Sequence, residues 1–336
     1  MPKLAAFDAP GAATVSSKEC RPYCGTVPSA IDAAGIITGF YTDKYIVPHG
    51  FILSSGNFIS FDAPGAGRKH GSNEGTVPLN INNHGAIAGQ FESAEQSYHG
   101  FIRQPNGDFM IVEAPGAGTG RGKGTIVTSI NDYGAYAGYY IDSRRVGHGF
   151  VGSAYGLLPF DPPGSIFTYV CFTQCINASG AVVGYFEDAK HATHGFVRMP
   201  SGTIRVIDAP QARLSYVTGI NNDGVLSGNY ADQKYAYSSF VFSKGKFTIY
   251  KVAGAGTVAN TIDASGAETG EYFTRDHSPN IGYYRTAQGA VETFSASGAG
   301  SRSRQGTIPV AMNATGTETG YYSDSAGLQH GFIVNR

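Results

Sequence analysis

The sequence predicts an all-β protein, a seven-bladed β-propeller with four-stranded blades, and three observations lead to this prediction. The 336 residues include 47 glycines and 16 prolines, which favour turns, and 21 tyrosines and 20 phenylalanines, which favour strands. Three short motifs recur in a fixed order, seven times each. Successive copies of one motif lie 43 to 50 residues apart, and this period suits four short strands per repeat.

The three motifs mark successive strands, A to D, of each repeat. The first, I-N/D-x-x-G-x-x-x-G-x-Y/F, spans the A–B turn and begins at Ile31, Ile81, Ile130, Ile176, Ile220, Ile262 and Met312. The second, H-G-F and its degenerate copies, lies in strand C and ends at Phe51, Phe101, Phe150, Phe196, Phe240, Tyr283 and Phe332. The third, F-D-A-P-G-A, ends strand D and begins at Phe7, Phe61, Val112, Phe160, Ile207, Tyr250 and Phe294.

The order of the motifs predicts one closed ring over residues 1–336. The D-strand motif comes first in the chain, and the last repeat lacks it, so residues 4–12 are expected to complete blade 7 and remove two open sheet edges. Gly39 lies inside a strand, where we expect the backbone of a neighbouring blade to approach closely. The predicted blades are 26–64, 76–115, 125–163, 169–210, 214–253, 257–297 and 307–336.

The charge and the motif content argue against several classes of protein. A net charge of −1 provides no general attraction to nucleic acid or to an anionic membrane. No apolar run approaches the ~20 residues that span a bilayer. The opening MPKLAAFDAPGA lacks the pattern of a signal peptide. We find no P-loop, G-x-S-x-G, H-E-x-x-H or EF-hand pattern.

The pattern I-N-x-x-G-x-x-x-G-x-Y followed by H-G-F resembles the HAF-repeat family, described as bacterial extracellular repeat proteins. The resemblance covers nearly the whole chain and implies an extracellular or periplasmic location. The middle residue of the tripeptide is glycine here, as at Gly50. Two repeats depart further, with Ser238 and Ile281 where histidine is expected.

The histidines that open strand C are expected to be structural. In most repeats an acidic residue precedes the histidine by six positions, across the B–C turn, so a carboxylate–imidazole bond can hold that turn. Strand C is also distant from the axis, so no metal site is predicted, although a metal on the axis is the alternative. The pairs are Asp43–His49, Asp142–His148, Asp188–His194 and Asp324–His330, with Glu92–His99 seven apart. The third-motif acids, such as Asp62, are expected to cap turn N–H groups.

The loops that the repeats do not share are the expected functional surface. The D–A and B–C loops lie on one face, here called the loop face, and the D–A loops hold nine lysines and arginines against two glutamates. This predicts a basic surface for an anionic ligand. Its members are Lys18, Arg21, Arg68, Lys69, Arg121, Lys123, Arg213, Arg302 and Arg304.

Histidines and tyrosines share this face. His70, His191 and His277 are candidate general bases. Tyrosine rings beside basic groups suit stacking on sugars and binding of uronate or sulfate. These tyrosines are Tyr23, Tyr45, Tyr98, Tyr169, Tyr235 and Tyr237, of which Tyr98 and Tyr169 are candidate ligand-binding residues.

The four cysteines form two C-x-x-x-C pairs. Cys20 and Cys24 can close a local disulfide if the chain is secreted. Cys171 and Cys175 align with strand A of blade 4, where four residues span ~13 Å, so buried thiols are expected unless the strand is broken.

Three functional hypotheses follow. The first is a secreted, monomeric binding or scaffold propeller that holds an anionic glycan or polymer on the loop face. The alternative is a polysaccharide lyase or hydrolase with its active site on the same face, where Arg or Lys would neutralise a uronate and His or Tyr would take the proton. The third is a protein-interaction platform, which requires a large apolar patch. No cofactor, nucleic acid or membrane partner is predicted.

Overall fold

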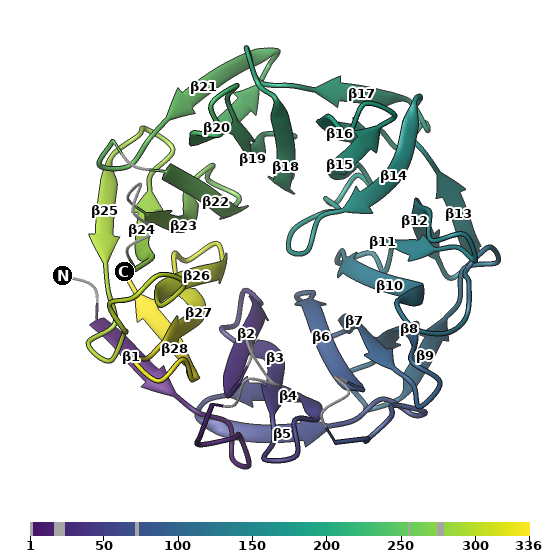
Figure 1. Cartoon of the computed structure of the whole chain (residues 1–336), viewed down its shortest axis with the longest axis vertical. Helices are drawn as coiled ribbons and strands as arrows, with labels where there is room; N and C mark the ends of the chain where they lie inside the picture. Colours follow the sequence, from purple (N-terminus) through teal and green to yellow (C-terminus); the bar gives the residue numbers. More distant parts are fainter. Residues whose placement is uncertain (1–2, 17–23, 71–73, 255, 274–278) are drawn as a thin grey trace.

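The computed structural model describes residues 3–16, 24–70, 74–254, 256–273 and 279–336. These residues form an all-β ring around a central opening (Figure 1), with 28 strands in the described part of the chain. The strands pair into seven antiparallel groups of four, here called units 1 to 7, with strand A nearest the axis and strand D at the rim.

Each unit is given in the order A to D. Unit 1 consists of β2 (Thr26–Ile31), β3 (Ile37–Thr42), β4 (Pro48–Ser54) and β5 (Asn57–Phe61). Unit 2 consists of β6 (Gly75–Ile81), β7 (Ile87–Glu92), β8 (Ser97–Arg103) and β9 (Phe109–Val112). Unit 3 consists of β10 (Lys123–Ile130), β11 (Tyr136–Ile141), β12 (Gly147–Ser153) and β13 (Gly156–Phe160). Unit 4 consists of β14 (Ser165–Val170), β15 (Val182–Asp188), β16 (Thr193–Arg198) and β17 (Ile204–Ile207). Unit 5 consists of β18 (Leu214–Ile220), β19 (Leu226–Ala231), β20 (Tyr237–Ser243) and β21 (Lys246–Tyr250). Unit 6 consists of β22 (Gly256–Ile262), β23 (Glu268–Phe273), β24 (Ile281–Arg285) and β25 (Val291–Phe294). Unit 7 consists of β26 (Gly306–Met312), β27 (Glu318–Ser323), β28 (Gln329–Asn335) and β1 (Lys3–Phe7).

The first strand of the chain closes the ring, as the motif order predicts. β1 pairs antiparallel with β28, with Phe7 opposite Gly331 and Lys3 opposite Asn335 (Figure 1). The Phe7 ring packs on Phe58 of unit 1 at a centroid distance of 5.9 Å. The N-terminal segment therefore joins unit 7 by backbone hydrogen bonds and unit 1 by aromatic packing.

The strand-interior glycines admit strand A of their own unit. A Cβ on Gly39 would overlap the carbonyl oxygen of Val27 on β2 and crowd the Phe51 ring. The β2–β3 register shifts between Pro28 and Ala30, and this bulge turns the Val27 carbonyl toward Gly39. The expectation that a neighbouring blade makes this approach is therefore wrong.

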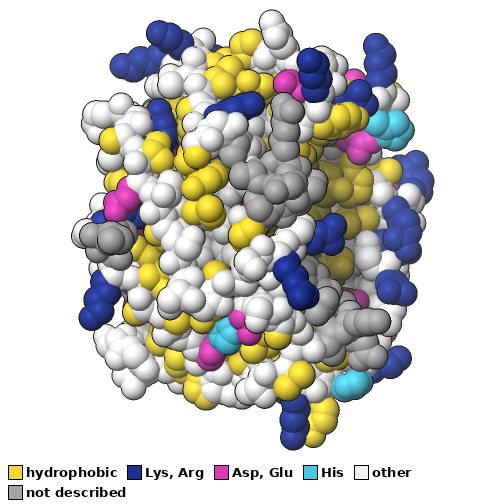
Figure 2. Space-filling view, turned by 60° about the vertical axis from the view of Figure 1, so that its left-hand side comes forward, with side chains coloured by type: hydrophobic (Ala, Val, Ile, Leu, Met, Phe, Trp, Pro, Cys, Tyr) yellow, Lys and Arg dark blue, Asp and Glu magenta, His cyan; other side chains and the backbone are white. Residues whose placement is uncertain are grey.

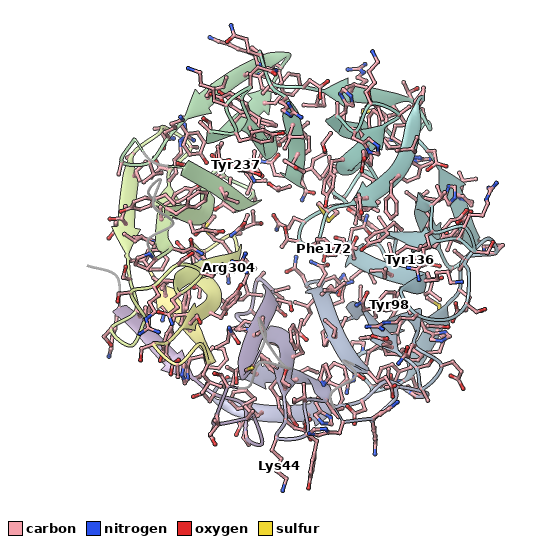
Figure 3. The ribbon with its side chains drawn as sticks, viewed as in Figure 1. Lys44, Tyr98, Tyr136, Phe172, Tyr237 and Arg304 are labelled. Carbon is pink, nitrogen blue, oxygen red and sulfur yellow. A yellow bond between two sulfur atoms is a disulfide. The ribbon has the colours of Figure 1, made fainter. Side chains whose placement is uncertain are left out.

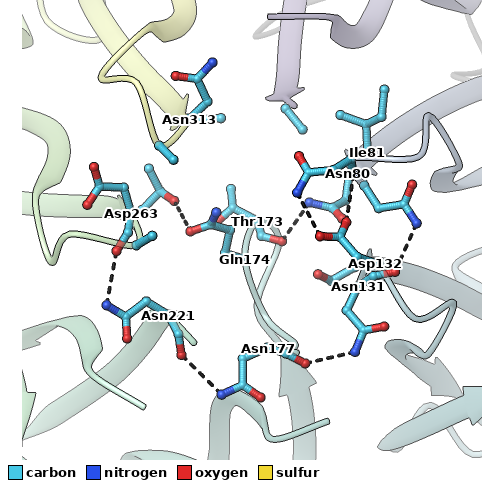
Figure 4. Close-up of a pocket in the computed structure, with 18 of the residues that line it drawn as sticks. Asn80, Ile81, Asn131, Asp132, Thr173, Gln174, Asn177, Asn221, Asp263 and Asn313 are labelled. Carbon is cyan, nitrogen blue, oxygen red and sulfur yellow. Dashed lines mark hydrogen bonds between the residues drawn. The ribbon is translucent and has the colours of Figure 1, made fainter. Parts of the chain in front are cut away.

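Asparagine side chains link neighbouring units on the face of the A–B turns. The Asn131 Nδ2 donates to the backbone oxygen of Asn177 in the next unit (2.9 Å), while its Oδ1 accepts the Tyr133 and Ala135 N–H groups of its own turn (3.0 Å each). The same link runs between further pairs of units at 3.0 to 3.2 Å. This asparagine belt comprises Asn82, Asn131, Asn177, Asn221 and Asn313 (Figure 4).

Two units carry aspartate at the belt position. Asp32 and Asp263 still accept the N–H groups of their own turns, Ile36 and Ala267 respectively. A carboxylate has no N–H to donate to the next unit, so the amide link is missing between units 1 and 2 and between units 6 and 7. Burial raises the pKa of Asp32, because the charged form loses hydration there.

Each strand-C histidine joins three strands of its unit on the loop face. In unit 1 the His49 Nδ1 lies 2.8 Å from Asp62 at the end of β5, and its Nε2 lies 3.6 Å from Asp43 of the B–C turn. The ring also stacks on Tyr41 at a centroid distance of 5.3 Å. The nearer contacts in the other units are His99–Glu113 (2.5 Å), His148–Asp161 (2.7 Å), His194–Asp208 (2.8 Å) and His330–Asp8 (2.9 Å).

The acids six positions upstream have a second role. Asp142, Asp188 and Asp324 lie 3.8, 3.5 and 3.7 Å from their histidines. Asp43 accepts the N–H groups of Tyr45 and Val47, so it also caps the B–C turn. In unit 2 the aligned turn residue is Ser93, one position after Glu92, and the His99 partner is Glu113.

The third-motif acids thus bind histidine rather than cap a turn, and the repeats carry a signal for this. Unit 5 has Ser238 at the histidine position and Lys251 at the acid position. Unit 6 has Ile281 and Ser295. The histidine and the acid are therefore lost together, as expected of two residues in contact.

We predict that an Asn177→Asp substitution weakens the ring. It removes the donor to the Asn221 carbonyl, which then keeps only the Gly224 N–H of its own turn, so the free energy of unfolding should fall by about 1 kcal/mol. The reverse change, Asp263→Asn, adds a donor facing unit 7 and should raise it by about 1 kcal/mol. Urea unfolding measures both.

A matched control uses the neighbouring residue. Asn222 accepts the Ala178 N–H through its Oδ1, a role that a carboxylate keeps, so Asn222→Asp should change stability little. Equal unfolding midpoints for Asn177→Asp and Asn222→Asp would contradict the role of the belt.

We also predict that the protein gains stability as the pH falls from about 8 toward 6. The hydrogen bond to Asp62 raises the pKa of His49, and the bond to Asp8 raises that of His330. For His194 burial acts in the opposite direction, but Asp208 and Asp188 raise the pKa overall. A folded-state pKa above the unfolded value of about 6.5 stabilises the fold below that value, and this stabilisation is lost as pH rises through the folded pKa.

Urea unfolding at a series of pH values measures this dependence. His49→Gln should reduce its slope, because one of the titrating groups is removed. An unfolding free energy that stays constant or rises between pH 6 and pH 8 would contradict the prediction.

Candidate functional site

A cavity of about 190 Å³ lies at the centre of the ring on the face of the A–B turns. Figure 4 shows belt residues such as Asn131, Asn177 and Asn221 around it, with Thr173 and Gln174 in the middle. Its wall is polar, but the belt amides in it already donate to backbone oxygens of neighbouring units. The cavity therefore offers few free donors to a ligand.

A group of aromatic rings lies on units 3 to 5. The Tyr169 ring stacks on Phe167 (4.3 Å) and Tyr185 (4.9 Å) and meets the Tyr139 ring edge-on at 5.5 Å. We call this group the aromatic arc, and it comprises Tyr139, Phe167, Tyr169, Phe172, Tyr185 and Tyr216.

Most of the arc is partly exposed. Phe167, Tyr169, Tyr185 and Tyr216 keep part of their surface open, and Phe172 is 47% exposed. Burial raises the pKa of Tyr185 to about 12, so its phenol stays protonated at neutral pH and can donate a hydrogen bond. A partly exposed run of aromatic faces with phenol groups at their edges suits the apolar faces and hydroxyl groups of sugars.

Two further tyrosines of the loop face, Tyr98 and Tyr237, lie near the arc. Burial raises the pKa of Tyr139, and the neighbouring Tyr98 phenol adds to this rise. Tyr237 acts on Tyr216 in the same way, although burial is the main cause there. In Figure 3, Phe172 lies beside the central opening, whereas Lys44 projects from the outer rim.

A carboxyl group that exchanges protons near neutral pH lies beside Tyr98. Burial and the negative charge of Glu74 raise the pKa of Glu92 to about 7, while Arg121 lowers it. Glu92 and Arg121 in turn act on the pKa of Tyr98, which burial raises. Tyr98, Glu92 and Arg121 thus form a small charged group next to the arc.

The predicted basic residues are spread over the loop face. Arg68 is 73% exposed and pairs with Asp62 at 3.2 Å, at the end of the outer strand β5. The Arg213 guanidinium lies 4.7 Å from the Tyr235 ring. In Figure 2, which brings the side of units 6 and 7 forward, Lys and Arg side chains lie at several places on the surface.

Other predicted basic residues are held by their loops. Lys69 donates its backbone N–H to Glu74 (3.2 Å), and Arg302 donates its own to Gln305 (2.9 Å). Arg304 is exposed and has a φ of 65°. Arg121 and Lys123, at the start of unit 3, lie nearest to Tyr98, since Lys123 pairs with Ser97 and Gly124 with Tyr98. Lys18, Arg21 and Tyr23 lie outside the described residues.

Two of the three predicted histidine bases lie in the described part of the chain. His70 is exposed, and its ring lies 6.3 Å from the Tyr45 ring. His191 is 77% exposed and contacts Glu187 through its Nδ1. His277 lies outside the described residues.

Buried thiols were expected in unit 4 unless strand A is broken there, and the strand is broken. Cys171 and Cys175 form a disulfide, and their Cα atoms are 5.4 Å apart. β14 ends at Val170, so the chain loops back between the two cysteines instead of extending along a strand. Cys24 is also disulfide-bonded, and Cys20 lies outside the described residues.

Two further properties of the described chain bear on function. No group of three or more His, Cys, Asp or Glu side chains within it is arranged to hold a metal ion. It also contains no helix with the length and apolar character of a membrane span.

The sequence singled out Tyr169 of the arc and the nearby Tyr98 and Tyr237, but it missed the other five arc residues. Tyr139 and Tyr185 occupy the same position of strand B in units 3 and 4, and Tyr216 occupies in unit 5 the strand-A position of Tyr169. The recurrence of tyrosine at these strand positions was the available signal.

The chain matches no protein-family model and no curated protein. Among solved structures, it is similar to the β-propeller domain of the Trilobed protease from Pyrococcus furiosus, with a TM-score of 0.59 and 10% identity over 92% of this chain and 95% of that one. It is also similar to the BP39L lectin from Burkholderia pseudomallei, with a TM-score of 0.52 and 10% identity over 92% and 97% of the two chains. At these identities the likeness concerns the fold, and it shows that the chain has a β-propeller fold.

Proposed function

We propose that the protein is a secreted, monomeric, seven-bladed propeller that binds a glycan on its loop face, with the aromatic arc as the contact surface. The observation that carries this proposal is the continuous run of rings from the buried Tyr139 to Tyr216, in which Tyr169, Tyr185 and Tyr216 are partly exposed. Aromatic faces stack on sugar rings, and phenols at their edges can bond hydroxyl groups.

Two further observations support parts of the proposal. The Cys171–Cys175 disulfide fits an oxidising, extracellular or periplasmic compartment, as the resemblance to HAF-repeat proteins implies. The similar BP39L protein is a lectin, so a propeller of this length can serve a sugar-binding protein. The scattered positions of Arg68, Arg213 and Arg304 favour a site at the arc over a broad basic face.

The anionic character of the ligand is proposed from the residues nearest the arc. Arg121 and Lys123 lie beside Tyr98, where they can bind a uronate or sulfate group of a sugar that stacks on the rings. An anionic glycan is therefore expected to bind more tightly than its neutral counterpart, and this preference should weaken with added salt.

We predict that Tyr185→Ala weakens glycan binding by about tenfold or more, since a ring at the centre of the arc is lost. A glycan array identifies the ligand, and titration calorimetry with that ligand measures the change. Tyr185→Phe keeps the stacking face and should retain most of the affinity.

Tyr155→Ala is the matched control, because Tyr155 is fully exposed in the β12–β13 turn, away from the loop face. Its affinity should equal that of the unmodified protein. Equal affinities for Tyr185→Ala and Tyr155→Ala would overturn the arc as the binding surface.

A lyase or hydrolase is the second candidate, and Glu92 is the observation that favours it. A carboxyl group with a pKa of about 7 can exchange a proton at neutral pH, and it lies beside Tyr98 and Arg121. Arg121 could neutralise a uronate carboxylate while Glu92 takes or gives a proton.

This candidate predicts turnover of a uronate-containing polysaccharide. Ultraviolet absorbance detects the unsaturated uronate of a lyase, and a reducing-end assay detects hydrolysis. Glu92→Gln should abolish turnover while leaving binding within about twofold. Binding with no product in either assay would reject the enzyme and leave the binding protein.

A further inference from the structure

Unit 4 differs from the other units at one point of strand A. In unit 3, two residues, Thr128 and Ser129, separate Val127 from Ile130 and form the strand bulge. In unit 4, five residues separate Val170 from Ile176, which is an insertion of three at the same bulge. The inserted residues are Phe172, Thr173 and Gln174, and the disulfide joins the residues on either side of them.

Thr173 ties the tip of this loop to units across the ring. Its backbone oxygen accepts the Asn80 Nδ2 of unit 2 at 3.3 Å. Its hydroxyl donates toward the backbone oxygens of Thr218 in unit 5 (3.3 Å) and Asn260 in unit 6 (3.1 Å). One residue therefore contacts three other units, which requires a position near the axis (Figure 4).

Gln174 adds two contacts. Its backbone oxygen accepts the Ile220 N–H of unit 5 at 3.0 Å, and its Oε1 accepts the Thr261 hydroxyl of unit 6 at 3.3 Å. Thr173 and Gln174 both line the cavity on the turn face. The loop thus occupies the centre of the ring and forms part of that cavity's wall.

Phe172 belongs to the aromatic arc. Its ring meets Tyr139 edge-on at a centroid distance of 6.2 Å and is 47% exposed. An apolar ring of that exposure, next to stacked tyrosines, is placed for contact with a ligand. The same insertion therefore supplies both the central contacts and a ring of the arc.

We propose that residues 171–175 form a disulfide-locked plug that lies at the centre of the ring and positions Phe172 as a ligand-contacting residue. The part concerning Phe172 rests on the proposed glycan binding, whereas the plug does not. The disulfide holds the ends of the insertion together, so the loop loses little further entropy when its tip binds units 2, 5 and 6. Cys171 and Cys175 are buried, at 3% and 0% exposure, so the disulfide is shielded from solvent.

The test combines hydrogen exchange with glycan affinity in the full chain. In Cys171→Ser/Cys175→Ser the loop loses its lock, so exchange at the Ile220 amide, which donates to Gln174, should speed up by about tenfold or more. The Asn82 amide, bonded to Ala86 in unit 2, is the internal reference and should keep its rate. Glycan affinity of this variant should fall by about fivefold or more.

Phe172→Ala separates the two parts. It should lower the affinity by about fivefold or more and leave exchange at Ile220 unchanged, because the contacts of Thr173 and Gln174 remain. Ile220 exchange as slow in the double-serine variant as in the unmodified protein would overturn the plug. Unchanged affinity in Phe172→Ala would overturn the role of that ring.

The outcome also distinguishes this inference from the proposed function. If the unmodified protein binds no glycan, the proposed function and the role of Phe172 fail together. Ile220 exchange then still decides the plug, because that readout requires no ligand.

Discussion

The pairing of β1 with β28 is the interaction on which the rest of the structure depends. Every unit packs one face on the preceding unit and one on the following unit, so an open ring would leave apolar surface and strand edges exposed at two places. The pairing of Ala6 with Phe332 brings residues from the two ends of the chain into one sheet. Phe7 then carries the contact into unit 1 through the Phe58 ring. The remaining links between units, such as the belt amides, form within a ring that this closure fixes.

Because the ring is built from similar units, only some positions in each unit are free to vary and to contribute to function. A position used for packing in every unit, such as the aromatic residue that ends the H-G-F motif, is fully buried, so a change there disturbs the core. The histidine position is less restricted, since units 5 and 6 carry Ser238 and Ile281 there. The variable features are insertions and surface rings, and unit 4 has both. A bulge in strand A tolerates extra residues because its pairing is already interrupted, and strand A is the strand nearest the axis. An insertion there reaches the centre of the molecule without disturbing the ladder on either side.

The repeats predicted most of the fold because each motif is read against six other copies. The strand order, the turns and the closing strand all follow from motif positions. The path of residues 171–175 did not, because counting back from Ile176 places both cysteines in strand A, whereas the strand is Ser165–Val170. The sequence predicted the contact of the His49 ring through Asp43, the acid nearer to it in sequence, although the Asp62 carboxylate lies nearer to that ring in space. The separation of two residues in the sequence indicates contacts within one turn, whereas the contact between strands C and D depends on the register of the sheet.

The two aspartates of the belt divide its amide links into two series. With Asp32 and Asp263 at these positions, the links run in one series from Asn82 to the Asp263 carbonyl and in a separate step from Asn313 to the Asp32 carbonyl. Other hydrogen bonds connect the units at the two interruptions, from the Ala33 N–H to the Asn83 Oδ1 and from the Asn260 Nδ2 to the Pro309 carbonyl. The pair of units that holds both chain termini is therefore joined to its neighbours by contacts of a different kind from those of the other five.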